Sequence, residues 1–325
     1  MLLRKMYYTV KPIIPRKAQI ALRRCLIRRK LRSHAAVWPI CPAAAQAPPG
    51  WTGWPDDKKF ALVLTHDVDT ARGHSRVRQL IEIEERLGFR SGVYFVAERY
   101  PVSAELRNDL ICAGFEVGVH GLKHDGKMYN SRAIFEDHAA RINQYLREWG
   151  SCGFRSPAMH HNLDWLRSLD IAYDASTFDT DPFEPQPHGV ETIFPFQVPD
   201  DGNRTGYIEL PYTLPQDWTL FVMMQEKSTA IWRRKLDWLA EHGGMALVIS
   251  HPDYMEFDKP PSFDSYPSLY YEEFLQYVKT RYAGQYWHVL PREMAQFWSE
   301  YGPQNVASEC PGFVTQSATA LTHTQ

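Results

Sequence analysis

Blocks of apolar residues alternate with polar blocks along most of the chain, and the sharpest junction follows the first such block. Four apolar residues in a row, Ala61-Leu62-Val63-Leu64, are followed at once by Thr65-His66-Asp67-Val68-Asp69. An uninterrupted apolar run is typical of a strand that is buried on both faces, as in a parallel sheet. Side chains two positions apart on a strand share a face. Asp67 and Asp69 are therefore predicted to point the same way, with His66 and Val68 opposite.

From Lys59 onward, short apolar runs alternate with segments of helical period. Strands are predicted at 60–66, 92–96, 115–120, 153–155, 171–174, 207–210, 245–250 and 288–290. Helices are predicted at 78–87, 104–113, 131–149, 162–169, 226–242, 270–282 and 292–301. This alternation predicts an α/β fold, a distorted (β/α) barrel of about seven parallel strands in a single main domain, with a doubly wound open sheet as the alternative. No GxGxxG follows a strand and no GxxxxGK[ST] occurs, so dinucleotide and P-loop binding have no support.

The composition divides the chain into four parts. Residues 1–37 form a basic N-terminal arm, and residues 38–58, rich in Pro and Trp, form an irregular linker. Residues 59–302 make up the barrel. Residues 303–325 are rich in Ser and Thr and are expected to be a disordered tail.

The charge is distributed unevenly along the chain. Residues 1–55 contain 11 Lys or Arg and no acid, which leaves 25 of the 36 bases against all 38 acids in the remainder. The acidic remainder makes nucleic acid an unsuitable partner. The basic arm either contacts an anionic membrane surface or packs loosely on the acidic domain as a solvated segment.

The cysteines indicate a reducing compartment. The five cysteines are scattered, show no CxxC spacing and are odd in number. This usage argues against a disulfide framework. The basic start is not followed by an apolar segment of the kind that makes a signal peptide, and no apolar run approaches the length of a membrane span. We therefore expect a cytoplasmic protein, peripheral to the inner face of the membrane if the arm binds lipid.

Ionisable residues stand at the ends of five predicted strands. They are His66-Asp67-Val68-Asp69, His120-Gly121-Leu122-Lys123-His124, Arg155-Ser156-Pro157, Tyr173-Asp174 and His251-Pro252-Asp253-Tyr254. Each alone is explained as a cap, a turn or a structural ion pair, but a barrel brings the carboxyl ends of its strands to one rim. Two imidazoles in the spacing H-x3-H, with a carboxylate, make a three-ligand site for a divalent cation. The sequence thus predicts a metal site.

This set of motifs resembles the polysaccharide deacetylases of carbohydrate esterase family four, over roughly residues 60–301. The resemblance implies a distorted (β/α) barrel that removes acetyl groups from N-acetylated sugars with a divalent metal, commonly zinc. It implies that Asp69, His120 and His124 bind the metal and that Asp67 is the general base. Arg155 would hold that base, His251 would be the general acid, and Asp174 would orient His251.

Two features depart from the commonest family pattern. The first motif is usually T-F-D-D-G, whereas here T-H-D-V-D places the second acid one residue later, as in a variant branch that also acts on other N-acyl or cyclic amides. The usual Ser or Thr after the first metal histidine is Gly121. Three functions remain open: deacetylation of an N-acetylated sugar or polysaccharide precursor, hydrolysis of another linear or cyclic amide, and a catalytically silent binding barrel.

Two loops are candidates for the walls of a substrate groove. The segment 177–199 carries Phe178, and the segment 251–266 carries Tyr254. Aromatic faces stack on sugar rings, so Tyr254 and Phe178 are candidate substrate-binding residues, although ordinary loop packing explains them equally well.

Overall fold

The computed structural model describes residues 15–303. The expected disordered tail, apart from Pro303, and the first part of the basic arm lie outside the described residues. The rest of the arm forms a helix, α2 (Arg16–Ser33). The linker folds into short 3-10 turns, η2 (Pro42–Ala45) and η3 (Pro55–Asp57), and the buried Trp54 donates from Nε1 to the Gly243 carbonyl (2.8 Å).

A curled sheet of nine strands forms the centre of the molecule, and all are parallel except the short strand β6. The strands are β1 (Phe60–Val68), β2 (Gly92–Phe95), β3 (Glu116–Val119), β4 (Gly153–Phe154), β5 (Tyr173–Asp174), β6 (Phe196–Val198), β7 (Tyr207–Glu209), β8 (Met245–Ser250) and β11 (Tyr286–His288). Thr213 and Leu214, just after β7, both donate from their backbone N–H to the Leu247 carbonyl of β8 (3.2 Å). The sheet therefore curls round almost to closure, which confirms the predicted distorted barrel.

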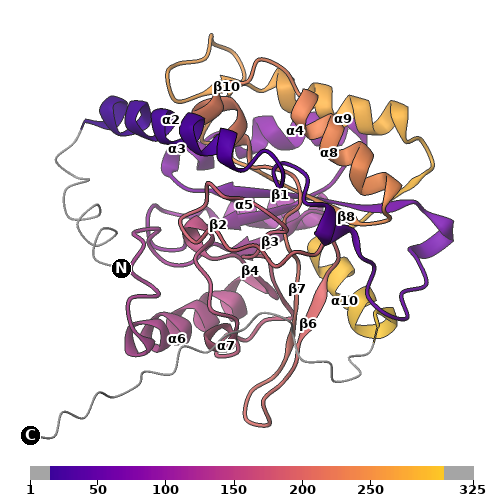
Figure 1. Ribbon diagram of the computed structural model, residues 1–325. Coiled ribbons are helices and arrows are strands. Elements are labelled where there is room, and N and C mark those ends of the chain that lie inside the picture. Colours follow the sequence, from indigo (N-terminus) through magenta and orange to yellow (C-terminus); the bar gives the residue numbers. More distant parts are fainter. Residues whose placement is uncertain (1–14, 304–325) are drawn as a thin grey trace, which may run out of the picture.

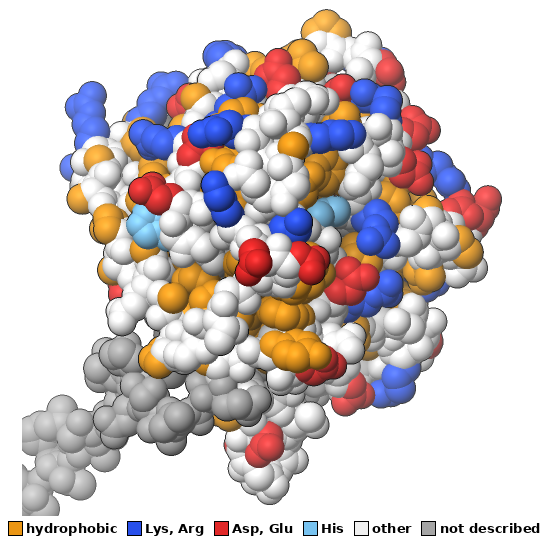
Figure 2. All heavy atoms as spheres, turned by 90° about the vertical axis from the view of Figure 1, so that its right-hand side faces the viewer, with side chains coloured by type: hydrophobic (Ala, Val, Ile, Leu, Met, Phe, Trp, Pro, Cys, Tyr) orange, Lys and Arg blue, Asp and Glu red, His pale blue; other side chains and the backbone are white. Residues whose placement is uncertain are grey.

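Helices cover the outside of the curled sheet, as Figure 1 shows. They are α3 (Ala71–His74), α4 (Val77–Leu87), α5 (Ala104–Cys112), α6 (Arg132–Trp149), α7 (Leu163–Leu166), α8 (Ala230–Glu241) and α9 (Leu269–Arg281). The helix α10 (Pro291–Tyr301) lies across the amino ends of the strands, where Arg292 donates its backbone N–H to Glu116 (2.9 Å). On the face shown in Figure 2, acidic and basic side chains are interspersed.

The predicted elements agree with the observed ones except in a few places. The last strand ends at His288 and not at 290, because Leu290 and Pro291 already begin α10. The elements that were not predicted include the short helix α3, the strand β6, the π-helix η5 (Trp218–Met224), and a small two-stranded sheet of β9 (Met255–Glu256) and β10 (Tyr266–Pro267). No helix in the described part of the chain is both long and apolar enough to cross a membrane.

Candidate metal and catalytic site

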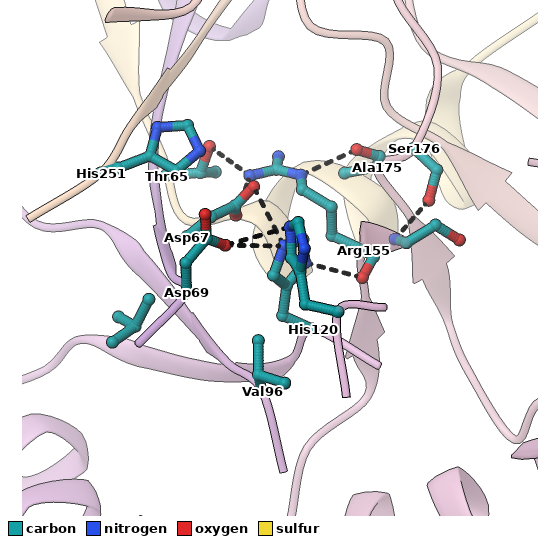
Figure 3. A network of polar contacts seen from close by, with 12 residues as sticks. Thr65, Asp67, Asp69, Val96, His120, Arg155, Ala175, Ser176 and His251 are labelled. Atoms are coloured by element: carbon teal, nitrogen blue, oxygen red, sulfur yellow. Dashed lines mark hydrogen bonds and ion pairs between the residues drawn. The ribbon is translucent and has the colours of Figure 1, made fainter. Parts of the chain in front are cut away.

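The polar side chains at the end of β1 point alternately to opposite faces of the sheet, as expected for a strand. Asp67 and Asp69 both point to the rim of the barrel, where they are almost wholly buried (Figure 3). His66 points the other way, and its Nε2 hydrogen-bonds the buried Glu84 carboxylate of α4 (2.8 Å). The histidine of T-H-D-V-D is therefore structural, and the two aspartates face the site.

Asp69, His120 and His124 converge on one point. The Asp69 Oδ1 atom lies 3.5 Å from His120 Nε2 and 3.3 Å from His124 Nε2. All three candidate ligand atoms lie within 4.8 Å of one another. Ligands held tetrahedrally at zinc distances lie about 3.4 Å apart, so these separations fit such an ion. Asp69 Oδ1 is also buried without a hydrogen-bond donor.

The histidines present neutral nitrogens to this point. His120 Nδ1 donates to the Arg155 carbonyl (2.9 Å), which leaves the Nε2 lone pair facing Asp69. Burial lowers the pKa of His124, and this favours the neutral imidazole that binds metals. Burial acts to raise the pKa of Asp69, but the neighbouring histidines, His251 among them, outweigh burial and lower the pKa. The donor set therefore suits a borderline divalent cation.

The loop between the two histidines explains Gly121, the departure from the family pattern. Gly121 has φ of 64°, and a Cβ there would lie 2.7 Å from Pro157 Cγ. A larger residue would push apart the segments that carry His120 and Arg155. His124 itself has φ of 47°, a left-handed conformation that costs a non-glycine residue about 1–3 kcal/mol. Such strain is typical of functional sites.

Asp67 is paired with Arg155, as predicted. Arg155 Nη1 donates to Asp67 Oδ1 and to Thr65 Oγ1 (both 2.9 Å), and its Nε donates to the Ala175 carbonyl (2.8 Å). Burial would raise the pKa of Asp67, but the Arg155 guanidinium and His120 lower it below the ordinary value. Asp67 is thus an oriented carboxylate beside the three candidate metal ligands, as a general base requires.

Two tyrosines fill the barrel interior beneath Arg155. The Arg155 guanidinium lies 4.7 Å from the centre of the Tyr94 ring, a cation–π contact. The hydroxyl groups of Tyr94 and Tyr173 are hydrogen-bonded (2.7 Å), and Tyr173 donates to Glu116 (2.6 Å). At Gly118 a Cβ would lie 2.3 Å from Tyr94, so glycine is required there. The interior packing therefore fixes the plane of the arginine.

His251 has an unexpected partner. Its Nδ1 donates to Asp217 Oδ1 (2.6 Å), and its backbone N–H donates to Asp217 Oδ2 (2.8 Å). Burial acts to lower the pKa of His251, but Asp217 outweighs it and, with Asp69 and Asp67, raises the pKa to about 10. An imidazolium is therefore stable at neutral pH, as a general acid requires.

The assignment of Asp174 as the orienting carboxylate was wrong. Both Asp174 oxygens accept bonds from Ser176, from its backbone N–H (2.9 Å) and its hydroxyl (2.7 Å). Asp174 also lies opposite Glu209 in the register of β5 and β7, and burial raises the pKa of both carboxyls. Asp174 therefore ties together neighbouring strand ends, and the carboxylate that contacts His251 is that of Asp217.

The two aromatic residues that were predicted to bind substrate lie in different places. Tyr254 is half-buried at the site, where its hydroxyl donates to Asp69 Oδ2 (3.3 Å) and its ring packs 4.4 Å from that of Trp218. Phe178 is fully buried against Tyr212, to which it is joined by a β-bridge, so its assignment to substrate binding was wrong. Trp218 was not predicted. The only signal for it and Asp217 was a polar stretch after the strand at 207–210.

Comparisons with known proteins show a likeness in structure. No family model matches the chain, and no curated protein matches its sequence. A Mycobacterium smegmatis protein assigned to the polysaccharide deacetylases is similar at 18% identity and a TM-score of 0.61, over 81% of this chain and 98% of that one. The Puue allantoinase (16%, 0.58, 78% and 94%) and a Pseudomonas aeruginosa PAO1 protein assigned to the polysaccharide deacetylases (18%, 0.57, 77% and 95%) are also similar. The fold is therefore one that these proteins share.

Proposed function

We propose that this protein is a metal-dependent hydrolase that removes an N-acetyl group from an N-acetylated sugar or polysaccharide precursor. One observation carries the proposal. The ligand set Asp69, His120 and His124 lies directly beside the pairs Asp67–Arg155 and His251–Asp217. A metal site, an ionised base and a protonated acid on one rim are what amide hydrolysis needs. The shared fold supports the proposal.

Each residue then has a distinct task. A divalent cation, most suitably zinc, would be held by Asp69, His120 and His124, and when bound it lowers the pKa of a water and polarises the acyl carbonyl. Asp67 accepts the proton of the attacking water. Arg155 keeps Asp67 ionised and fixes its direction.

His251 completes the reaction by protonating the leaving nitrogen. An amine leaves as a neutral group only when it receives a proton, and Asp217 holds that proton on His251. Tyr254 and Trp218, half-buried beside His251, offer aromatic faces to a sugar ring.

Acetate release from N-acetylated oligosaccharides tests the proposal. We expect His120→Ala and Asp67→Asn each to abolish release, because the first removes a metal ligand and the second removes the base. The matched controls His242→Ala and Asp56→Asn change exposed residues remote from the site and should retain activity. Full activity in either site variant would overturn the proposal.

A second candidate is hydrolysis of another linear or cyclic amide on the same scaffold. The T-H-D-V-D spacing favours it, because this spacing resembles that of a variant branch that also acts on other N-acyl or cyclic amides. A panel of acetylated sugars, small N-acyl compounds and cyclic amides, assayed with the same enzyme preparation, separates the two. The catalytically silent alternative predicts no stoichiometric metal after purification without chelators.

The proposed location is the cytoplasm. Four cysteines in the described residues, Cys25, Cys41, Cys112 and Cys152, are free, which agrees with a reducing compartment.

A further inference from the structure

The helix α2 has an extreme charge. Its 18 residues, RKAQIALRRCLIRRKLRS, include eight Lys or Arg and no acid. This contrasts with the interspersed charges of the face in Figure 2. Like charges on one helix repel one another and destabilise it, so such a helix is expected to have a partner that compensates for the repulsion.

The contacts of α2 place it on the catalytic rim. Arg24 Nε donates to the Val222 carbonyl in η5 (3.0 Å), and Lys30 Nζ donates to the Pro182 carbonyl (3.1 Å). Arg16 Nε forms an ion pair with Asp264 (3.1 Å). All three partners lie in segments that follow the carboxyl ends of strands, after β7, β5 and β8 respectively. The helix therefore borders the same rim as the metal and catalytic residues.

The two sides of α2 differ in exposure. Ile20 is buried toward the barrel. On the opposite side Leu22 and Leu26 are 53% and 52% exposed. Arg29 and Arg32 lie on that outward side, are exposed, and have no acidic partner within residues 15–303. Phe263, also exposed, packs beside the helix under Lys17.

This combination fits a lipid surface better than other anions. Exposed leucines among unpaired arginines on one helix suit the boundary between lipid headgroups and acyl chains. A nucleic acid would be attracted by the Lys and Arg residues of α2 but would gain nothing from the leucines. The acidic remainder of the chain would repel it. Two leucines alone bury too little for firm anchoring, so the basic residues must provide most of the attraction.

We propose that the outward side of α2, formed by Leu22, Leu26, Arg29 and Arg32, docks the catalytic rim onto an anionic lipid membrane. Docked in this way, the rim faces the membrane surface. If the proposed function also holds, the substrate class is an acetylated saccharide anchored to lipid. This choice of substrate rests on the proposed function. Docking itself does not depend on that chemistry.

Vesicle binding tests the docking. Each basic residue near an anionic membrane contributes about fivefold in affinity, so Arg29→Gln with Arg32→Gln should weaken binding to phosphatidylglycerol-containing vesicles about 25-fold. The matched control, Arg90→Gln with Arg281→Gln, removes two exposed charges near the amino ends of the strands and should bind like the unaltered protein. Binding should disappear in high salt and on purely zwitterionic vesicles. Equal binding by both double variants would overturn the proposal.

Native cysteines test the orientation. Cys25 is exposed on α2, and Cys112 is exposed at the end of α5, near the amino ends of the strands. With the other cysteines replaced by serine, an environment-sensitive fluorophore on Cys25 should shift to the blue on adding phosphatidylglycerol vesicles, and one on Cys112 should not. A shift at Cys112 alone, or self-association of the protein through α2 in light scattering without vesicle binding, would overturn the proposal. Neither readout uses acetate release, so this proposal and the proposed function can fail separately.

Discussion

Replacement of Asp217 by Asn removes the charge that holds a proton on His251. The ordinary histidine pKa of 6.5 and the value of about 10 for His251 differ by an amount equivalent to roughly 5 kcal/mol, at about 1.4 kcal/mol for each pH unit. Burial acts in the opposite direction and lowers the pKa. Asp69 and Asp67 still act to raise the pKa, so without the Asp217 carboxylate the pKa of His251 should fall from about 10 towards 6.5.

The kinetic consequence grows with pH. At pH 8 a histidine of pKa 6.5 is protonated to about 3%, so acetate release should fall by up to about 30-fold, with a smaller loss below pH 6.5. The assay is the initial rate of acetate release across this pH range, alongside Asp237→Asn, which removes a carboxylate bound by Tyr277 and Tyr282 far from the site. An unchanged alkaline limb in Asp217→Asn would refute the assignment of His251 as the acid.

The same pair should also affect stability. The pKa of His251 is higher in the folded protein than in the unfolded chain, so protonated His251 stabilises the fold fully below pH 6.5. This contribution is lost as the pH rises towards 10. Urea unfolding at several pH values should show a decline over this range in the unaltered protein, and a smaller decline in Asp217→Asn.

Three further changes test other parts of the site. Arg155→Met leaves the buried Asp67 carboxylate without its partner, so urea unfolding should show a loss of about 3–5 kcal/mol and the acidic limb of the rate profile should move to higher pH. Gly118→Ala places a methyl group against the Tyr94 ring, so unfolding should show a loss of about 1–3 kcal/mol and acetate release should fall as the ring beneath Arg155 shifts. His124→Ala removes one of three ligands, so elemental analysis should show less than stoichiometric metal in a folded protein.

The sequence predicts the fold well where a pattern is local. The buried strand β1 and the long helix α6 end close to the predicted residues, because apolar runs, the Ser131 cap and the stop at Gly150 are read from neighbouring positions. The π-helix η5 has no comparable local signal. The position of α2 has no local signal either, because its basic residues fall all around the helix and Arg24 lies on the side that faces the barrel.

The same distinction applies to the residues of the site, some of which could be predicted from local patterns and some of which could not. Residues at the end of a strand or directly after it, such as Asp67, Asp69 and Arg155, were found because a parallel barrel brings strand ends together. The partner of His251 could not be found by that rule. Asp217 lies 34 residues before His251, at the N-terminal cap of the π-helix η5, and only the folded chain shows that it, and not Asp174, reaches the imidazole. Phe178 was misjudged because its β-bridge to Tyr212 buries it.

The central claim is that Asp69, His120 and His124 hold a divalent cation. Anomalous diffraction at the zinc edge, from crystals of the protein grown with zinc and without chelators, tests it most directly. We expect one strong anomalous peak within bonding distance of Asp69 Oδ1 and both histidine Nε2 atoms, beside Asp67. No peak there, or a peak held by other residues while this site stays empty, would contradict it.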